Sequence, residues 1–185
     1  MKNIILASAS PRRRELLTHA GFSLTIVNPD ADETWPSGGT PEEAVMEIAR
    51  RKLNAVGLHD HLPVLAADTV VWQHGEAIGK PTDRDHARRM LRQLSGTCHT
   101  VITGFCVGYR GRILQESVKT EVWFRPLSND DIEDYLATGE GDDKAGSYAV
   151  QGIGAGLVDR IEGSYTNIIG LPVREVIELL KKINQ

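Results

Sequence analysis

An acidic side chain inside an apolar stretch is the first feature of this chain that could do chemistry. Asp68 lies within the run Val64–Val71, where only Thr69 is otherwise polar. An ionised carboxylate in a buried strand is costly unless it is paired or bound to a metal. The ends of sheet strands are also where α/β proteins place their sites. Asp68 is therefore either a functional carboxylate or an aspartate at the strand's exit that bonds backbone N–H groups.

A lysine falls within the apolar face of a predicted helix. The segment Thr40–Glu43 has the pattern of a capping box, and the helix that it opens extends to about Val56. Ile48, Ala49 and Val56 share one face of this helix. By the 3.6-residue period, Lys52 falls at the centre of that face. Lys52 either extends its ammonium group to the rim of the helix or serves a polar cavity.

Three consecutive arginines occupy the first turn of another predicted helix. Ser10 and Pro11 indicate its start, with serine as N-cap and proline at the first position. Arg12–Arg14 then stand at the positive end of the helix dipole, where each cation is unfavourable by about 0.3–1 kcal/mol. This arrangement predicts a bound anion, phosphate above all, held by N–H groups, guanidinium groups and the hydroxyls of Ser8 and Ser10. The alternative is a solvated basic turn that pairs with surface carboxylates.

Charged residues elsewhere complete a set that suits a polyphosphate. Four cations could together bind several phosphate groups: Arg12, Arg13, Lys52 and Lys80. Glu33, in a polar loop with other acidic residues, and Asp68 could hold a divalent ion between them. The sequence contains no Walker loop and no HExxH, CxxC or GxSxG motif. These residues therefore indicate phosphate chemistry without one of the widespread catalytic signatures.

The elements that must position these residues mix strands and helices. Hydrophobic patterns predict strands over residues 3–7, 24–28, 63–72, 99–109, 113–124 and 156–161. Helix signals predict helices from residue 11 to about 20, 40 to about 56, 82 to about 95, 128 to about 138, and 172 to about 183. A hairpin is expected at Tyr109–Arg112. The pattern is typical of an α/β protein with a mixed sheet and flanking helices.

Composition limits the classes of protein to consider. The chain has 185 residues, enough for one domain with a core, and its net charge of −4 disfavours a general nucleic-acid binder. No apolar run approaches the length of a membrane span. Its two cysteines, Cys98 and Cys106, are too far apart along one extended strand to form a disulfide. Reduced cysteines and the lack of a signal-peptide pattern predict a cytoplasmic protein.

Taken together, the motifs of this chain resemble the Maf family of nucleoside triphosphate pyrophosphatases over nearly the whole length. The matching segments are Ala7–Leu17, Ala67–Val71, Gly79–Pro81, Leu94–Gly96, Asp143–Tyr148, Val150–Gly152, Gly163–Asn167 and Gly170–Pro172. The resemblance implies a single domain over residues 1–185, with a mixed twisted sheet, flanking helices and two lobes around a central cleft, related to inosine triphosphate pyrophosphatases. It also implies cleavage between the α and β phosphates with Mg²⁺ or Mn²⁺.

The same resemblance implies a role for each candidate residue. Asp68 would be the catalytic proton acceptor, with Lys52 and Lys80 as further catalytic residues. Ser8 and Arg13 would bind phosphate, and Glu33 would join Asp68 at the metal. Three positions would set base preference: Arg12, Thr69 and Gln151.

The substrate branch follows from the segments Asp143–Tyr148 and Gln151–Gly152, which resemble the branch that prefers dTTP and UTP. Two alternatives stay open: the same chemistry on 7-methyl-GTP, and a nucleotide-binding regulator of cell division with little turnover. The partner expected is a nucleoside triphosphate rather than a nucleic acid or a membrane. Homodimers are usual in such families, so a homodimer is a further expectation.

Overall fold

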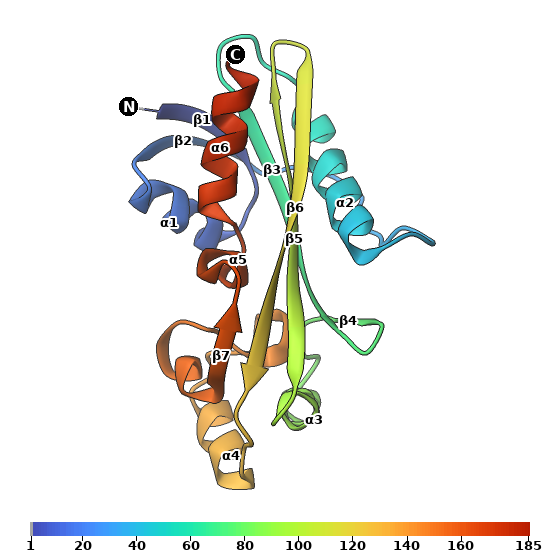
Figure 1. The fold of residues 1–185 in the computed structure, drawn as a ribbon, viewed down its shortest axis with the longest axis vertical. Helices are drawn as coiled ribbons and strands as arrows, with labels where there is room; N and C mark the ends of the chain where they lie inside the picture. The colour runs from blue at the N-terminus through green and yellow to red at the C-terminus, as the bar shows by residue number, and fades with distance from the viewer. Residues whose placement is uncertain (1) are drawn as a thin grey trace. The chain divides into compact units, whose positions relative to one another are not determined.

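The computed structural model describes residues 2–185 and contains a seven-stranded mixed sheet flanked by helices (Figure 1). The strand order is β2-β1-β3-β5-β6-β7, with β4 paired to β3. The strands are β1 Lys2–Ala7, β2 Phe22–Val27, β3 Val64–Gln73, β4 Glu76–Ile78, β5 Cys98–Tyr109, β6 Arg112–Phe124 and β7 Val158–Glu162. The helices are α1 Pro11–His19, α2 Pro41–Val56, α3 Arg84–Leu94, α4 Asn129–Ala137, α5 Tyr165–Ile169 and α6 Val173–Ile183, with 3₁₀ turns η1 Ala145–Ser147 and η2 Gly152–Leu157. The predicted mixed α/β class is confirmed.

The chain divides into two compact units. Unit 1 contains the residues up to Thr69, Ile102–Val118 and Gly170–Gln185, and unit 2 contains Val70–Val101 and Lys119–Ile169. Each unit is assembled from separate stretches, so neither corresponds to one continuous segment of sequence. Two units agree with the two lobes that the sequence predicts.

In unit 1, helices cover both faces of the sheet, and alternate strand residues face opposite ways (Figure 1). Ile4 and Leu6 of β1 belong to a core cluster that also contains residues of α1 and α6. Their neighbours Ile5 and Ala7 belong to a second cluster, with residues of α2. β1 pairs in parallel with both β2 and β3, and a parallel arrangement of this kind requires burial on both faces.

The two helices that carry candidate residues, α1 and α2, each have a side-chain cap at the N-terminus, as the sequence predicts. Ser10 Oγ accepts a hydrogen bond from Arg13 N at 3.4 Å, with proline at the first position of α1. At α2, Thr40 and Glu43 form a reciprocal capping box.

Two short elements escape prediction from sequence, namely β4 and α5. Three and five residues are too few to display a hydrophobic period. Strand β7 also begins later than expected, at Val158, because η2 occupies the preceding glycine-rich residues. No helix among residues 2–185 is both long and apolar enough to cross a membrane. Cys98 and Cys106 are free thiols, as expected from their spacing.

The core of unit 2 contains a cluster of three rings. His99 and Tyr148 meet edge to face with centroids 5.3 Å apart, and Phe124 packs in the same manner against both. His99 Nε2 lies 2.8 Å from the Tyr148 hydroxyl oxygen. Burial lowers the pKa of His99 to about 4 from its ordinary value of 6.5.

This pKa shift predicts a loss of stability below neutral pH. Between pH 6.5 and 4 the unfolded chain binds a proton that folded His99 does not, so stability decreases as the pH falls. From pH 7 to pH 5 the loss from this residue is about 2 kcal/mol. Urea unfolding at both pH values checks it, with the non-titrating His99→Gln variant as the comparison. An equal loss in the variant would contradict the assignment.

A glycine in β5 predicts a packing defect. A Cβ atom on Gly104 would lie 2.4 Å from Met46 N and 2.5 Å from the Val45 carbonyl carbon, which are backbone atoms of α2. Gly104→Ala is therefore expected to destabilise the protein by about 3 kcal/mol, measured by urea unfolding. Gly156→Ala is the control, because a Cβ atom there would meet no atom within 4 Å. A Gly104 variant as stable as the control would contradict the prediction.

Candidate active site

The last two residues that β3 contributes to unit 1 are both candidate site residues, and they face opposite ways. Ala66 packs in the cluster that contains α2, and Ala67 packs in the cluster that contains α1 and α6. By the period of two, Asp68 faces α2 and Thr69 faces α1. The hydrogen bonds of both side chains agree with this alternation.

On the α2 side, a buried ammonium group joins two carboxylates. Lys52 is 6% exposed, and its Nζ lies 2.8 Å from Asp68 Oδ1 and 3.0 Å from Glu33 Oε2. Lys52 therefore does not extend to the rim of the helix. Among the acids of the loop before α2, Asp32 instead forms an ion pair with Arg51, at 3.7 Å. The structure thus selects Glu33 as the loop residue that reaches Asp68 and Lys52.

On the α1 side, Arg13 is 8% exposed and donates to four acceptors. Its Nε donates to the Gly170 carbonyl at 2.9 Å, and its Nη1 donates to the Ala67 carbonyl at 2.8 Å and to Ser8 Oγ at 3.3 Å. Its Nη2 donates to Thr69 Oγ1 at 3.1 Å, which leaves one N–H of the guanidinium for a ligand. Arg13 thus holds the end of β3 in place.

Burial lowers the pKa of Arg13, while the negative charges of Asp68 and Glu33 oppose that shift. An arginine stays protonated near neutral pH even when buried, so Arg13 supplies a fixed positive charge behind the strand end. The predicted contact between Arg13 and phosphate stays a prediction.

Hydroxyl groups complete this side of the site. Ser8 is buried, and its Oγ also accepts from Ser10 N at 3.2 Å. Thr69 Oγ1 lies 2.9 Å from Thr103 Oγ1 and 3.2 Å from the Gly170 carbonyl oxygen. Thr103 is a further site residue that was not predicted, because its only signal in the sequence is a hydroxyl within the apolar run of β5.

The structure brings six of the nine predicted residues into two sets of contacts at the end of β3 in unit 1: Glu33, Lys52 and Asp68 on the α2 side, and Ser8, Arg13 and Thr69 on the α1 side. Arg12 belongs to the same unit and is half-buried on α1. Lys80 and Gln151 belong to unit 2, where both are exposed. Neither of these two side chains has a hydrogen-bond partner within residues 2–185, so both are available to a ligand.

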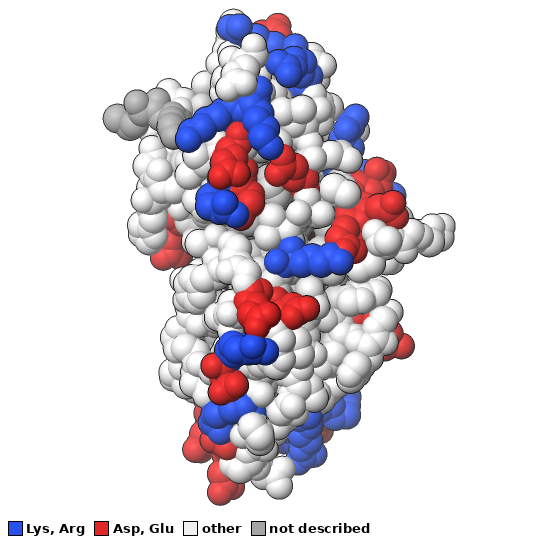
Figure 2. All heavy atoms as spheres, viewed as in Figure 1, with Lys and Arg blue, Asp and Glu red and all other residues white. Residues whose placement is uncertain are grey.

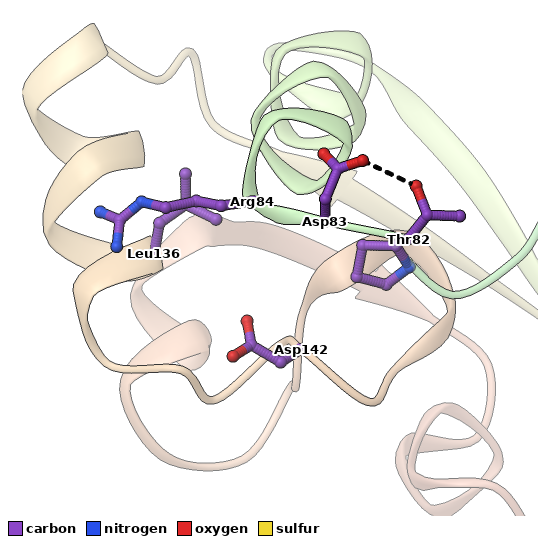
Figure 3. Close-up of a pocket in the computed structure, with 6 residues that line it drawn as sticks. Thr82, Asp83, Arg84, Leu136 and Asp142 are labelled. Carbon is purple, nitrogen blue, oxygen red and sulfur yellow. Dashed lines mark hydrogen bonds between the residues drawn. The ribbon is translucent and has the colours of Figure 1, made fainter.

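The charges on the face drawn in Figure 2 do not mark this site. Figure 2 shows acidic and basic side chains interspersed over the visible face, rather than gathered by sign. Unit 2 has a hollow of about 270 Å³, lined by Pro81, Thr82, Asp83, Arg84, Leu136 and Asp142 (Figure 3). None of the predicted site residues lines that hollow. Two cations of the candidate site, Arg13 and Lys52, are instead buried.

The carboxylates near Lys52 fit a divalent cation whose other ligands come from a bound phosphate compound. Two carboxylates, from Glu33 and Asp68, converge on one Lys52 Nζ. No group of three or more His, Cys, Asp or Glu residues in the described part of the chain could hold a metal ion. Mg²⁺ is commonly bound by one or two carboxylates, with water and phosphate oxygens as the other ligands. This donor set therefore suits Mg²⁺ or Mn²⁺ carried by a polyphosphate.

Comparisons with known proteins agree over nearly the whole chain. A family model described as "Maf-like protein" matches residues 3–183. A protein named dTTP/UTP pyrophosphatase from Pelotomaculum thermopropionicum is 47% identical over 187 residues, covering 98% of this chain and 97% of its own. One of the same name from Pyrococcus abyssi is 44% identical over 181 residues, covering 96% and 95%.

Among solved structures, a HAM1 protein from Coxiella burnetii has a TM-score of 0.52 and 17% identity, covering 98% of this chain and 100% of that one. At this identity the likeness concerns the fold alone.

The hydrogen bonds of Arg13 predict a large effect of a conservative change. In Arg13→Lys, one ammonium group replaces the planar guanidinium and cannot donate to both carbonyls. The carbonyl oxygens of Ala67 and Gly170 would then lose hydrogen bonds. We expect a loss of about 3 kcal/mol in the free energy of unfolding, measured with urea. Arg14→Lys on the exposed side of α1 is the control and should change stability by less than about 0.5 kcal/mol. Equal stability of both variants would show that these bonds contribute little.

Proposed function

Because the chain belongs to the Maf family, we propose that it hydrolyses dTTP and UTP to the nucleoside monophosphate and pyrophosphate. The name shared by its relatives supports the substrates. The observation that carries the proposal is the buried ammonium group of Lys52, which joins Asp68 and the exposed Glu33 at the end of β3. A lysine ammonium group is costly to bury, and phosphate chemistry with a divalent cation gives this one a use.

The reaction needs positive charge, because a nucleoside triphosphate carries about four negative charges near neutral pH. In unit 1, Arg13 and Lys52 provide cations at the two sides of the β3 end. Bound Mg²⁺ or Mn²⁺, held by Asp68 and Glu33, would offset phosphate charge and stabilise the pyrophosphate leaving group. Arg12 and Lys80 are the further cations proposed to contact the phosphates.

Asp68 is proposed to accept the proton of the attacking water. The water oxygen forms a bond to the α-phosphorus, and the bond from that phosphorus to the oxygen bridging to the β-phosphate breaks. Pyrophosphate leaves with the electron pair of the broken bond. Lys52 Nζ, at 2.8 Å from Oδ1, holds the carboxylate in a fixed orientation for this step.

Base preference is proposed to involve Thr69 and Gln151. The Thr69 hydroxyl is fixed by Arg13, Thr103 and the Gly170 carbonyl, so it can present a defined contact. The Gln151 amide can donate to and accept from a pyrimidine edge. We also propose that the protein acts in the cytoplasm, since Cys98 and Cys106 form no disulfide.

The test is pyrophosphate release with Mg²⁺ or Mn²⁺ across dTTP, UTP, CTP, GTP and 7-methyl-GTP. We expect dTTP and UTP to be the preferred substrates, and Asp68→Asn to lower kcat/KM for both by about 10³-fold. Asp60→Asn is the matched control, because Asp60 is exposed in the same unit and its side chain has no hydrogen-bond partner within residues 2–185.

Two results would contradict the proposal. Turnover of 7-methyl-GTP alone would keep the chemistry and reject the pyrimidine preference. No turnover of any nucleotide would reject the enzymatic function and favour a nucleotide-binding regulator.

Omission of the metal, with a chelator present, should abolish turnover, and addition of Mg²⁺ or Mn²⁺ should restore it.

A further inference from the structure

We propose that Glu140 is a positioning residue for base recognition, because it holds the turn that carries Gln151. The inference rests on the proposed function, in which the Gln151 amide reads the pyrimidine. Glu140 lies in the loop after α4, eleven positions before Gln151 in the sequence. Both residues belong to unit 2, so every contact in the argument lies within one unit.

The Glu140 carboxylate binds the backbone directly after Gln151. Its Oε1 accepts from Ile153 N at 3.0 Å, and its Oε2 accepts from Gly154 N at 2.8 Å. Both N–H groups lie in the first turn of η2. Hydrogen bonds to an ionised carboxylate are roughly twice as strong as neutral ones. One side chain therefore binds two consecutive N–H groups of the turn.

Glu140 is itself held by neighbouring side chains. The Tyr135 hydroxyl from α4 accepts from Ala149 N at 3.0 Å, and the charge of Glu140 acts on this hydroxyl. Burial, and then the charge of Glu140, raise the pKa of Tyr135, so this hydroxyl stays protonated and can donate. Lys144 Nζ donates to the Glu140 carbonyl oxygen at 2.5 Å. The carboxylate thus has little freedom to leave the turn.

The glycines of the turn allow this close approach. Gly152 has φ of +69°, and a Cβ atom there would lie 2.0 Å from Glu140 Oε1. A Cβ atom on Gly154 would lie 2.1 Å from the Ala149 carbonyl oxygen. Neither position accepts a side chain without displacing the carboxylate or the backbone. The turn is therefore shaped around Glu140.

The side chain of Gln151 receives no such support. It is exposed, it does not cap η2, and it has no hydrogen-bond partner among the described residues. Only its backbone, extended at φ −91° and ψ 158°, determines where the amide can point. An amide that must meet a donor and an acceptor on one base edge loses discrimination when its backbone moves. Glu140 thus acts on the base through Gln151.

The experiment is a double-mutant cycle on UTP hydrolysis. Glu140→Gln keeps the size of the side chain but replaces one carboxylate oxygen with an NH₂ group, which cannot accept from a backbone N–H. We expect this change to raise KM for UTP about tenfold, with kcat within about twofold. In a Gln151→Ala background, the same change should alter KM by less than about twofold, because the amide that it positions is gone. Glu121→Gln, an exposed glutamate of β6 in the same unit, is the matched control.

Hydrogen–deuterium exchange over residues 151–155 gives a readout that does not depend on turnover. Glu140→Gln should accelerate exchange there relative to both wild type and Glu121→Gln. Unchanged exchange, or an equal loss of activity with and without Gln151, would overturn the role of Glu140 while leaving the proposed function intact. A wild-type protein that releases no pyrophosphate from any nucleotide would overturn the proposed function, and the recognition role with it.

A second variant covers the case in which Glu140→Gln does not fold. Glu140→Asp keeps the charge but shortens the side chain by one methylene, so it should raise KM for UTP about threefold. That rise should also disappear in the Gln151→Ala background. A rise that persists there would show that Glu140 supports the fold alone, and would overturn the proposal.

Discussion

A lysine ammonium group buried between two carboxylates is the constraint on which the candidate site depends. Lys52 Nζ loses its water, and its contacts with Asp68 and Glu33 replace that water. The pairing requires α2 to face β3 with Lys52 at the strand end, and it requires the preceding loop to bring Glu33 inward. The three groups carry one positive and two negative charges. The excess negative charge makes the cluster favourable for a further cation.

Because side chains alternate along β3, the adjacent residues Asp68 and Thr69 face opposite sides of the strand and have different partners. Asp68 faces α2 and the charged cluster, whereas Thr69 faces α1 and the guanidinium of Arg13. Arg13 also binds the carbonyls of Ala67 and Gly170, so it joins the strand end to the residues just before α6. The sequence predicts that Arg13 binds phosphate, but most of its guanidinium N–H groups donate to acceptors within the protein. A positive charge used in this way is close to the site and costs no reorganisation when substrate binds.

In unit 2, the conformation around the candidate residue Gln151 has a different physical basis. Gln151 and its neighbours form no long element with a hydrophobic face, and their conformation depends on glycines and on backbone hydrogen bonds to Glu140. A turn of this kind is determined by one side chain, so a single substitution can move it. In unit 1, by contrast, the site residues lie on a strand and on helices whose positions are fixed by two core clusters.

Local patterns in the sequence were enough to predict the mixed α/β class, the capped starts of α1 and α2, and the presence of a lysine and an aspartate where apolar residues were expected. These features are local, because caps, periods and breaks in a period are written in neighbouring residues. The family motifs added the roles. Long-range packing decided that Glu33 rather than Asp32 reaches Lys52, and that Thr103 lies against Thr69. It also decided that Arg13 binds the Gly170 carbonyl, 157 positions away in the chain. Every residue carries a carbonyl group, so no residue type marks the one that an arginine will meet, and only the packing of distant segments brings the two together.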